Sequence, residues 1–264
     1  MIKLNYLSIL LTMGKAIIFA NQKGGVGKTT TAVNLGSYLA SMGKNVLLVD
    51  FDPQGNMSLA VNGDRQRSGI YELILQKAQT NDVIQHTREP RLDLIAANVN
   101  LSGINVELAE LEGREFFLRN ALAPIKNKYN FIFIDSPPSL DLVTVNGLTA
   151  ADLVMIPLQT EFFAIEGTSQ LIRTIMMVKQ NLNPSLELGG IILTMKDNRT
   201  HLSKNVVDEA VAYFKDKVFR TAIPRNVALA EAPSFGKTIR EYQPFSPGAR
   251  AYEILAKEVL DRVQ

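Results

Sequence analysis

Cysteine is absent from this chain of 264 residues, and histidine is scarce, with only His86 and His201. Without thiolates the chain can form no disulfide, no cysteine-based zinc site and no iron–sulfur cluster. Two histidines also argue against a histidine-rich metal site. These absences exclude disulfide-stapled scaffolds and cluster-based redox proteins.

Long apolar runs and a strong net charge are missing as well. No run approaches the roughly 18–20 apolar residues that a membrane-spanning helix needs. The net charge is +2, and there is no polybasic tail. Residues 196–250 nevertheless carry ten basic and six acidic side chains, a local excess that suits a modest anionic partner.

A short apolar patch runs from Leu4 to Leu11, ahead of Met13, Gly14 and Lys15. It is short for the core of a signal peptide, and it lacks a small-residue cleavage site. We expect residues 1–12 to be a mobile N-terminal extension and residues 13–264 to form a single domain. A segment that touches a membrane is the alternative for the extension.

Apolar runs alternate with helix-like periodicity along the rest of the chain. This alternation predicts an α/β fold, with a mostly parallel sheet flanked by helices on both faces. Strands are expected at residues 15–20, 45–50, 92–96, 130–135, 152–157, 189–195 and 217–221. Helices are expected at residues 28–42, 69–78, 113–127, 140–150, 166–182, 202–216 and 249–263. Ordered loops are expected at residues 222–224, 232–234 and 243–248.

The most informative motif follows the first expected strand, where residues 21–30 read Asn-Gln-Lys-Gly-Gly-Val-Gly-Lys-Thr-Thr. Its glycines allow backbone N–H groups to close around phosphate oxygens. Lys28 can reach the β- and γ-phosphates, and the hydroxyl of Thr29 can bind Mg²⁺. The helix that begins near Lys28 directs its N-terminal dipole at the anion. The motif predicts a P-loop that binds a nucleoside triphosphate.

This loop departs from the usual G-x-x-x-x-G-K-[ST] pattern, because Gln22 replaces the first glycine and Lys23 follows it. A lysine at the mouth of the loop can point away from its own nucleotide. We infer that Lys23 reaches phosphates bound by a second copy of the chain, which predicts nucleotide-dependent dimerisation. A solvated loop lysine is the simpler alternative.

Aspartates end two of the expected strands, Asp50 and Asp135. The carboxyl ends of strands form the ligand crevice of an open α/β sheet. Asp135 begins Asp-Ser-Pro-Pro-Ser and resembles the Walker B aspartate that holds Mg²⁺. Asp50 and Asp52 point to opposite sides if the chain stays extended, so we expect one near the metal and one near an attacking water. A helix cap or turn is the alternative for a single aspartate of this kind.

Together these motifs make the chain similar to the ParA/Soj branch of the ParA–MinD family of deviant Walker A P-loop ATPases, over about residues 13–263. The matching segments are residues 23–30, 49–56, 135–139 and 223–234. The resemblance implies ATP and Mg²⁺ as cofactors, slow hydrolysis stimulated by a ParB-like partner, and an ATP-bound homodimer. It also implies a cytoplasmic, nucleoid-associated protein that positions a chromosome, a plasmid or other cargo.

The resemblance also assigns residues. It implies catalytic roles for Lys23, Lys28 and Asp52, with Asp52 matching the aspartate whose loss blocks hydrolysis. ATP contacts are expected from Lys23, Gly24, Gly25, Val26, Gly27, Lys28, Thr29, Thr30, Pro224, Arg225 and Asn226. Metal ligands are expected at Thr29, Asp50 and Asp135.

Non-specific DNA binding by the ATP-bound dimer is a further implication of the resemblance. Arg199 falls at one DNA-contact position of the family, whereas Ala228 stands where Soj-like relatives have arginine. This departure puts the DNA footprint in doubt or shifts it to neighbouring basic residues. The candidates are Arg199, Lys204, Arg220, Arg225 and Arg250, and for each a solvated surface position is the alternative.

Three other functions stay open. A MinD-like, membrane-associated positioning ATPase needs an amphipathic C-terminal helix with a cationic face, whereas residues 249–264 mix acidic and basic side chains, so no stable membrane association is expected. A metabolic P-loop enzyme, such as an ATP-dependent ligase or a kinase, needs an acceptor pocket. A nucleotide-gated scaffold would hydrolyse poorly.

Overall fold

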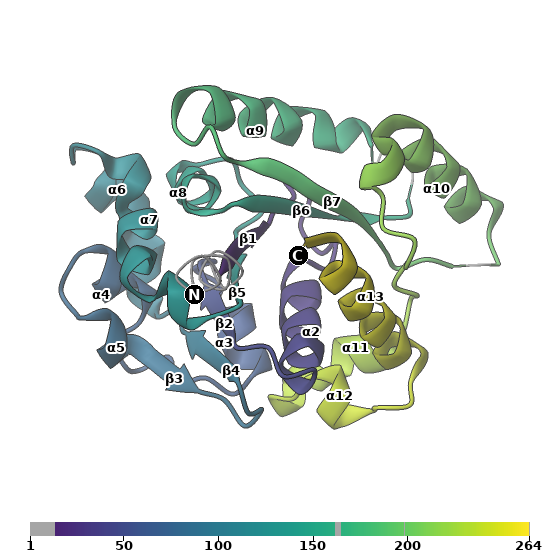
Figure 1. The fold of residues 1–264 in the computed structure, drawn as a ribbon, viewed down its shortest axis with the longest axis horizontal. Helices are drawn as coiled ribbons and strands as arrows, with labels where there is room; N and C mark the ends of the chain where they lie inside the picture. The colour runs from purple at the N-terminus through teal and green to yellow at the C-terminus, as the bar shows by residue number, and fades with distance from the viewer. Residues whose placement is uncertain (1–13, 162–164, 198, 264) are drawn as a thin grey trace, which may run out of the picture.

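The computed structural model describes residues 14–161, 165–197 and 199–263, which contain a seven-stranded sheet (Figure 1). Its strands are β1 (Lys15–Phe19), β2 (Val46–Asp50), β3 (Ile84–His86), β4 (Leu92–Ile95), β5 (Phe131–Asp135), β6 (Leu153–Gln159) and β7 (Glu187–Thr194). Their order in the sheet is β3-β4-β2-β5-β1-β6-β7. Only the pairing of β3 with β4 is antiparallel. The prediction of a mostly parallel α/β sheet is confirmed.

Helices connect these strands. The larger ones are α2 (Lys28–Ser41), α8 (Leu142–Ala150), α9 (Ser169–Asn181), α10 (His201–Phe214) and α13 (Pro247–Val263). Shorter ones are α3 (Asn56–Ala60), α4 (Ile70–Ile74), α5 (Thr80–Val83), α6 (Ile104–Leu108), α7 (Phe117–Leu122), α11 (Val227–Glu231) and α12 (Ile239–Tyr242). The 3₁₀ turns of the described residues are η1 (Val99–Gly103), η2 (Arg114–Phe116), η3 (Ala123–Lys128), η4 (Glu166–Thr168), η5 (Lys215–Lys217) and η6 (Ala232–Phe235).

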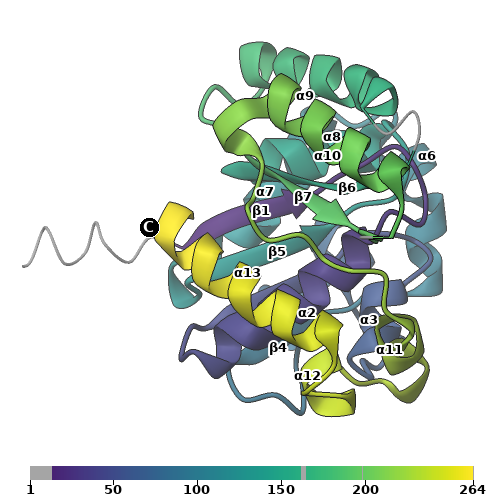
Figure 2. The ribbon, with the colours of Figure 1, turned by 90° about the vertical axis from the view of Figure 1, so that its right-hand side faces the viewer.

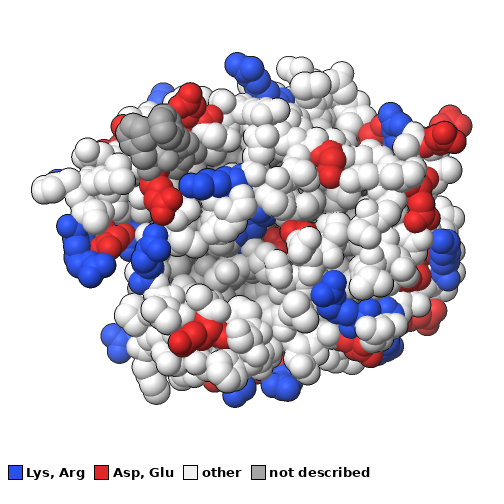
Figure 3. All heavy atoms as spheres, turned by 180° about the vertical axis from the view of Figure 1, so that it is seen from behind, with Lys and Arg blue, Asp and Glu red and all other residues white. Residues whose placement is uncertain are grey.

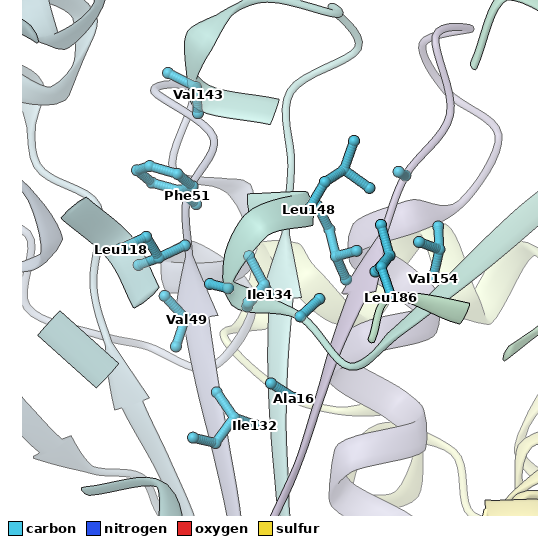
Figure 4. Packing of buried hydrophobic residues seen from close by; sticks show 14 of the residues in the cluster. Ala16, Val49, Phe51, Leu118, Ile132, Ile134, Val143, Leu148, Val154 and Leu186 are labelled. Carbon is cyan, nitrogen blue, oxygen red and sulfur yellow. The ribbon is translucent and has the colours of Figure 1, made fainter. Parts of the chain in front are cut away.

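The sheet separates two apolar clusters, because successive side chains of a strand point to opposite faces. On β1, Ile18 belongs to one cluster and Ile17 and Phe19 to the other. The first cluster packs under α7, α8 and α9, and Figure 4 shows part of it around Ile134 and Leu148. The second packs under α2 and α13, which lie side by side in Figures 1 and 2. Helices therefore cover both faces, as predicted.

The strand register places the chemistry-bearing residues at one edge of the sheet. Phe19, which ends β1, pairs with Asp135 of β5, and Asp135 pairs with Asp50 of β2. The strands run towards the face seen in Figure 3, which looks at the molecule from behind Figure 1. The phosphate loop and both strand-end aspartates therefore meet at the carboxyl edge, where ligands bind in open α/β sheets.

Several predicted elements were wrong. Residues 217–221 form no strand. Val218 makes an isolated bridge to Ile191 of β7, and Phe219 N donates to Ile191 O at 2.9 Å. The N–H groups of Arg220 and Thr221 then donate to the Glu258 carboxylate of α13 instead. The short antiparallel strand β3 was missed. The expected helix at 113–127 is broken into η2, α7 and η3, with a proline in the first turn of η3. The loop expected at 232–234 forms η6. The predicted extension at residues 1–12 lies outside the described residues.

Candidate nucleotide-binding site

The P-loop joins β1 to α2 and has the backbone shape that phosphate binding needs. Gly25 and Gly27 adopt φ angles of 74° and 92°, in the left-handed region that favours glycine. A Cβ atom on Gly24 or Gly25 would meet nothing within 4 Å, so space for a ligand lies above the loop. Asn21 fixes the start of the loop, because its side chain donates to Pro157 O at 2.8 Å and accepts from Lys23 N at 3.0 Å.

Two adjoining cavities open over this loop. The first, of about 530 Å³, is lined by the P-loop from Gly24 to Thr30 without Val26, by Asp52 and by η6. The second, of about 340 Å³, is lined by Pro224, Arg225 and Asn226 together with Met195 and Tyr252. Gly27 and Thr30 border both cavities. The predicted phosphate and adenine positions therefore lie next to each other, and their combined space suits a nucleotide.

Two predicted ATP-binding residues lie differently from the others. Val26 is buried, and its carbonyl accepts a hydrogen bond from Thr194 Oγ1 at 2.8 Å, so only its backbone can serve a ligand. Lys23 is not part of the lining of either cavity as far as the chain is described. Its Nζ instead lies 3.4 Å from Glu161 Oε2, at the end of β6, and both side chains are about half exposed. Lys23 thus contacts Glu161 and not the described lining of either cavity.

Lys28 is buried at the first position of α2, with 7% of its surface exposed, and it lines the first cavity. Burial lowers the pKa of this lysine, and the charges of Asp135 and Asp52 oppose that shift. A phosphate in the cavity would add negative charge next to a cation that has lost its hydration. Lys28 is therefore placed to bind an anion.

A pair of side chains fits a magnesium ion. Thr29 Oγ1 donates to Asp135 Oδ2 at 2.6 Å, while Asp135 Oδ1 is buried without a hydrogen-bond partner. Burial, followed by the charge of Asp50, raises the pKa of Asp135 well above its usual range, so a cation nearby would stabilise the carboxylate. The described residues contain no cluster of three or more metal-binding side chains, so Mg²⁺ would take its other ligands from phosphate and water.

The structure does not bring Asp50 to this site as a free ligand. Asp50 is fully buried, and its Oδ2 accepts hydrogen bonds from the N–H and the hydroxyl of Ser58, at 2.7 and 2.6 Å. Burial raises its pKa to about 6. The chain also does not stay extended after β2, since Asp52 N turns back towards Asp50 Oδ1 at 3.4 Å. Asp50 therefore anchors α3, whereas Asp52 lines the cavity with 7% of its surface exposed.

Two of the candidate DNA-binding residues are paired with carboxylates. Arg199 is exposed but bound by both its Nε and Nη2 to the carboxylate of Asp197, at 2.9 and 2.7 Å. Arg225 pairs with Glu161 at 3.3 Å. Lys204 lies exposed on α10, Arg250 on α13 and Arg220 beside η5. Figure 3 shows basic and acidic side chains interleaved on the face at the carboxyl edge. Ala228 is buried in the second apolar cluster and offers no surface there.

Sequence reasoning missed two residues of this site. Glu161 binds both Lys23 and Arg225. Its place just after a strand that ends at the carboxyl edge of the sheet was the signal in the sequence that could have found it. Tyr252 of α13 lines the second cavity, and its hydroxyl lies 3.1 Å from Thr31 Oγ1 of α2. The helical periodicity of residues 249–263 gave no sign that Tyr252 has a polar partner 221 residues away.

Comparison with known proteins decides the family. A family model described as "AAA domain" matches residues 14–188. The chromosome-partitioning ATPase Soj of Treponema pallidum is 52% identical over 250 residues, which cover 95% of this chain and 98% of that protein. The chromosome partitioning protein ParA of Caulobacter vibrioides is 48% identical over 252 residues, with 94% of each chain covered. This chain belongs to the Soj/ParA family of chromosome-partitioning ATPases.

Solved structures resemble this Soj/ParA chain in fold. Cobyrinic acid a,c-diamide synthase of Mycobacterium smegmatis, with ADP and magnesium bound, is 36% identical with a TM-score of 0.82, and 94% of each chain is covered. The septum site-determining protein MinD of Pyrococcus horikoshii, complexed with Mg-ADP, is 26% identical with a TM-score of 0.76, covering 94% of this chain and 96% of that one. The predicted family and P-loop fold are confirmed, and the predicted cofactors agree with these ligands.

Proposed function

We propose that this protein is a partition ATPase that forms a homodimer on ATP, binds DNA non-specifically in that form and positions a chromosome, a plasmid or other cargo. Residues 13–264 would act as one ATPase domain in the cytoplasm, on the nucleoid. Hydrolysis would be slow until a ParB-like partner stimulates it. The family membership supports the ATPase and partition roles, and the geometry around Lys23 supports the dimer.

The chain's own residues divide the work on ATP. Lys28 and the N–H groups of the P-loop hold the phosphates, while Thr29 and Asp135 hold Mg²⁺, which neutralises phosphate charge when bound. Asp52, which lines the first cavity, accepts a hydrogen bond from the attacking water and so orients it. The pocket formed by Pro224, Arg225 and Asn226 receives the base. None of these steps uses Lys23, so we infer that this lysine serves a second copy of the chain.

The single observation that carries the dimer is the direction of Lys23. The side chain of Lys23 is about half exposed and lies outside the cavity lining, and its Nζ lies 3.4 Å from Glu161 Oε2 in an exposed setting. Exposed ion pairs of this kind contribute about 0–1 kcal/mol, so the lysine can leave Glu161 at small cost. A partner's triphosphate would offer it an anion of higher charge than the Glu161 carboxylate.

The decisive experiment compares three variants by sedimentation with Mg²⁺ and a hydrolysis-resistant ATP analogue. Lys23→Ala should bind the analogue but stay monomeric, and Lys179→Ala, which removes an exposed lysine of α9, should dimerise like the parent. Asp52→Ala should form a dimer with ATP itself and keep it, because hydrolysis is blocked. An ATP-dependent dimer of Lys23→Ala with the parental affinity would refute the assignment of Lys23.

A metabolic enzyme is a second candidate, because a structure named cobyrinic acid a,c-diamide synthase is 36% identical over nearly the whole chain. Such an activity would require a carboxylic acid substrate and a nitrogen donor for ATP turnover. Steady-state hydrolysis separates the two functions. The partition ATPase should respond to DNA with a partner protein and ignore the acid, whereas the synthase should show the reverse.

The MinD-like alternative requires a helix with a free apolar face. The apolar residues of α13, among them Tyr252, Leu255 and Val259, are buried in the second cluster against α2. The other side of α13 carries the ion pairs Lys257–Glu253 and Arg262–Glu258. None of the helices in the described part of the chain is long and apolar enough to cross a membrane. These contacts favour a core helix.

A further inference from the structure

The segment between α3 and α4 is held tightly against the sheet. The side chain of Gln85 in β3 accepts from Asp64 N and donates to Asp64 O, both at 2.8 Å. Gly69 packs so closely on the carbonyl of Ala96 that a Cβ atom there would collide with it. The backbone on either side of Arg65 is therefore fixed, and the side chain of Arg65 starts from a rigid base.

From this base the guanidinium of Arg65 lies on the turn that carries Asp52. Its Nε donates to Ala97 O at 3.1 Å, and the rest of the group covers the Cα of Gly55, where a Cβ atom would collide with Nε, Cζ and Nη2. Gly55 is buried with a φ of 68°. Over the described residues, no carboxylate forms an ion pair with Arg65. The guanidinium is thus placed by packing and one hydrogen bond.

Gly55 in turn fixes Asp52. Gly55 N donates to Asp52 O at 2.9 Å, and Gln54 N donates to Asp52 Oδ1 at 2.9 Å, so the turn and the carboxylate are one hydrogen-bonded unit. The same unit continues into α3, where Leu59 N donates to Gly55 O at 3.0 Å. A shift of Gly55 would therefore move the carboxylate that faces the first cavity.

We propose that Arg65 is a positioning residue for ATP hydrolysis, which holds the Asp52–Gly55 turn in place through its packing on Gly55. This inference rests on the proposed role of Asp52. Arg65 does not line the cavity and contacts no nucleotide position, so its loss affects the hydrolytic step and spares ATP binding. A catalytic group displaced by about 1 Å can lose about 100-fold in rate, which sets the scale of the effect.

Arg65→Ala tests this directly. We expect kcat to fall by roughly tenfold or more, with ATP affinity and melting temperature close to the parental values. Arg65→Lys should stay impaired, since an ammonium group is neither planar nor able to form the Nε contact. Arg67→Ala, which removes an exposed arginine two residues away, is the matched control and should behave like the parent. A parental kcat in Arg65→Ala, or equal losses of kcat and ATP affinity, would overturn the proposal.

A double substitution adds a readout that a general loss of stability would not give. Gly55→Ala has to displace the guanidinium and also strains the turn at its φ of 68°, so Arg65→Ala should lower kcat little further in that background. Independent, additive losses would overturn the contact as the cause. Asp52→Ala is measured in parallel. Parental turnover in Asp52→Ala would refute the proposed role of Asp52 itself. An inactive Asp52→Ala together with a fully active Arg65→Ala would refute only the proposed role of Arg65.

Discussion

Replacing Ser58 by alanine should destabilise the protein strongly, although the change removes a single oxygen. Ser58 is fully buried, and its Oγ donates to Asp50 Oδ2 at 2.6 Å while accepting from Ala97 N at 3.0 Å. A hydrogen bond to a charged group contributes about 1.5–3 kcal/mol, and an orphaned buried N–H costs about 1–3 kcal/mol. We therefore expect the free energy of unfolding to fall by about 3 kcal/mol at pH 7.

Urea unfolding of the variant and the parent measures this difference, provided that the slope with urea is unchanged. Ser41→Ala is the control, since the exposed Ser41 bonds only to Tyr38 O of its own helix, and it should cost less than about 0.5 kcal/mol. The deficit of Ser58→Ala should shrink at pH 5, where Asp50, with a pKa of about 6, is mostly protonated and needs no charge-stabilising donor. A cost below about 1 kcal/mol at pH 7 would refute the reasoning.

Four further changes test the site. Asp135→Asn should abolish the strengthening of ATP binding by Mg²⁺ in calorimetric titrations, and retained Mg²⁺ dependence would reassign the metal ligand. Tyr252→Phe should lower the free energy of unfolding by about 1 kcal/mol, because it orphans a buried hydroxyl, and an unchanged urea midpoint would contradict this. Asp50→Asn should flatten the pH dependence of the free energy of unfolding between about pH 4 and pH 6. In the parent, the folded Asp50 carboxyl binds its proton more tightly than at the ordinary pKa of 3.8, so its contribution to stability is lost as pH rises through this range. An unchanged slope would argue against a raised pKa. Arg199→Glu should weaken the binding of unrelated DNA duplexes by the ATP-bound form at both low and moderate salt, whereas full binding in mobility shifts would place the footprint elsewhere.

Residues close together in the chain explain most of what the sequence predicted correctly. The P-loop is a local motif, since its glycines, Lys28 and Thr29 act through ten consecutive residues between a strand and a helix. Apolar runs such as residues 131–134 have no polar face to expose, and their short length and β-branched or aromatic side chains favoured strands buried on both sides. The family resemblance rests on the same short motifs. None of these inferences needed a contact between distant parts of the chain.

Tertiary contacts decided what the sequence left open. Asp50 and Asp52 look alike in the sequence. Because the chain turns directly after β2, Asp50 accepts hydrogen bonds from Ser58, whereas Asp52 lines the first cavity. Residues 217–221 have a strand-like composition, but Glu258, 38 residues from Arg220, accepts the hydrogen bonds of the Arg220 and Thr221 N–H groups. The position of the Lys23 side chain depends on Glu161. The position of Arg65 over Gly55 depends on the contacts that hold the segment between α3 and α4 against the sheet. Pattern and propensity act within one turn or one strand, so the sequence by itself determined the fold and the phosphate loop, and the folded chain alone determined which charges meet.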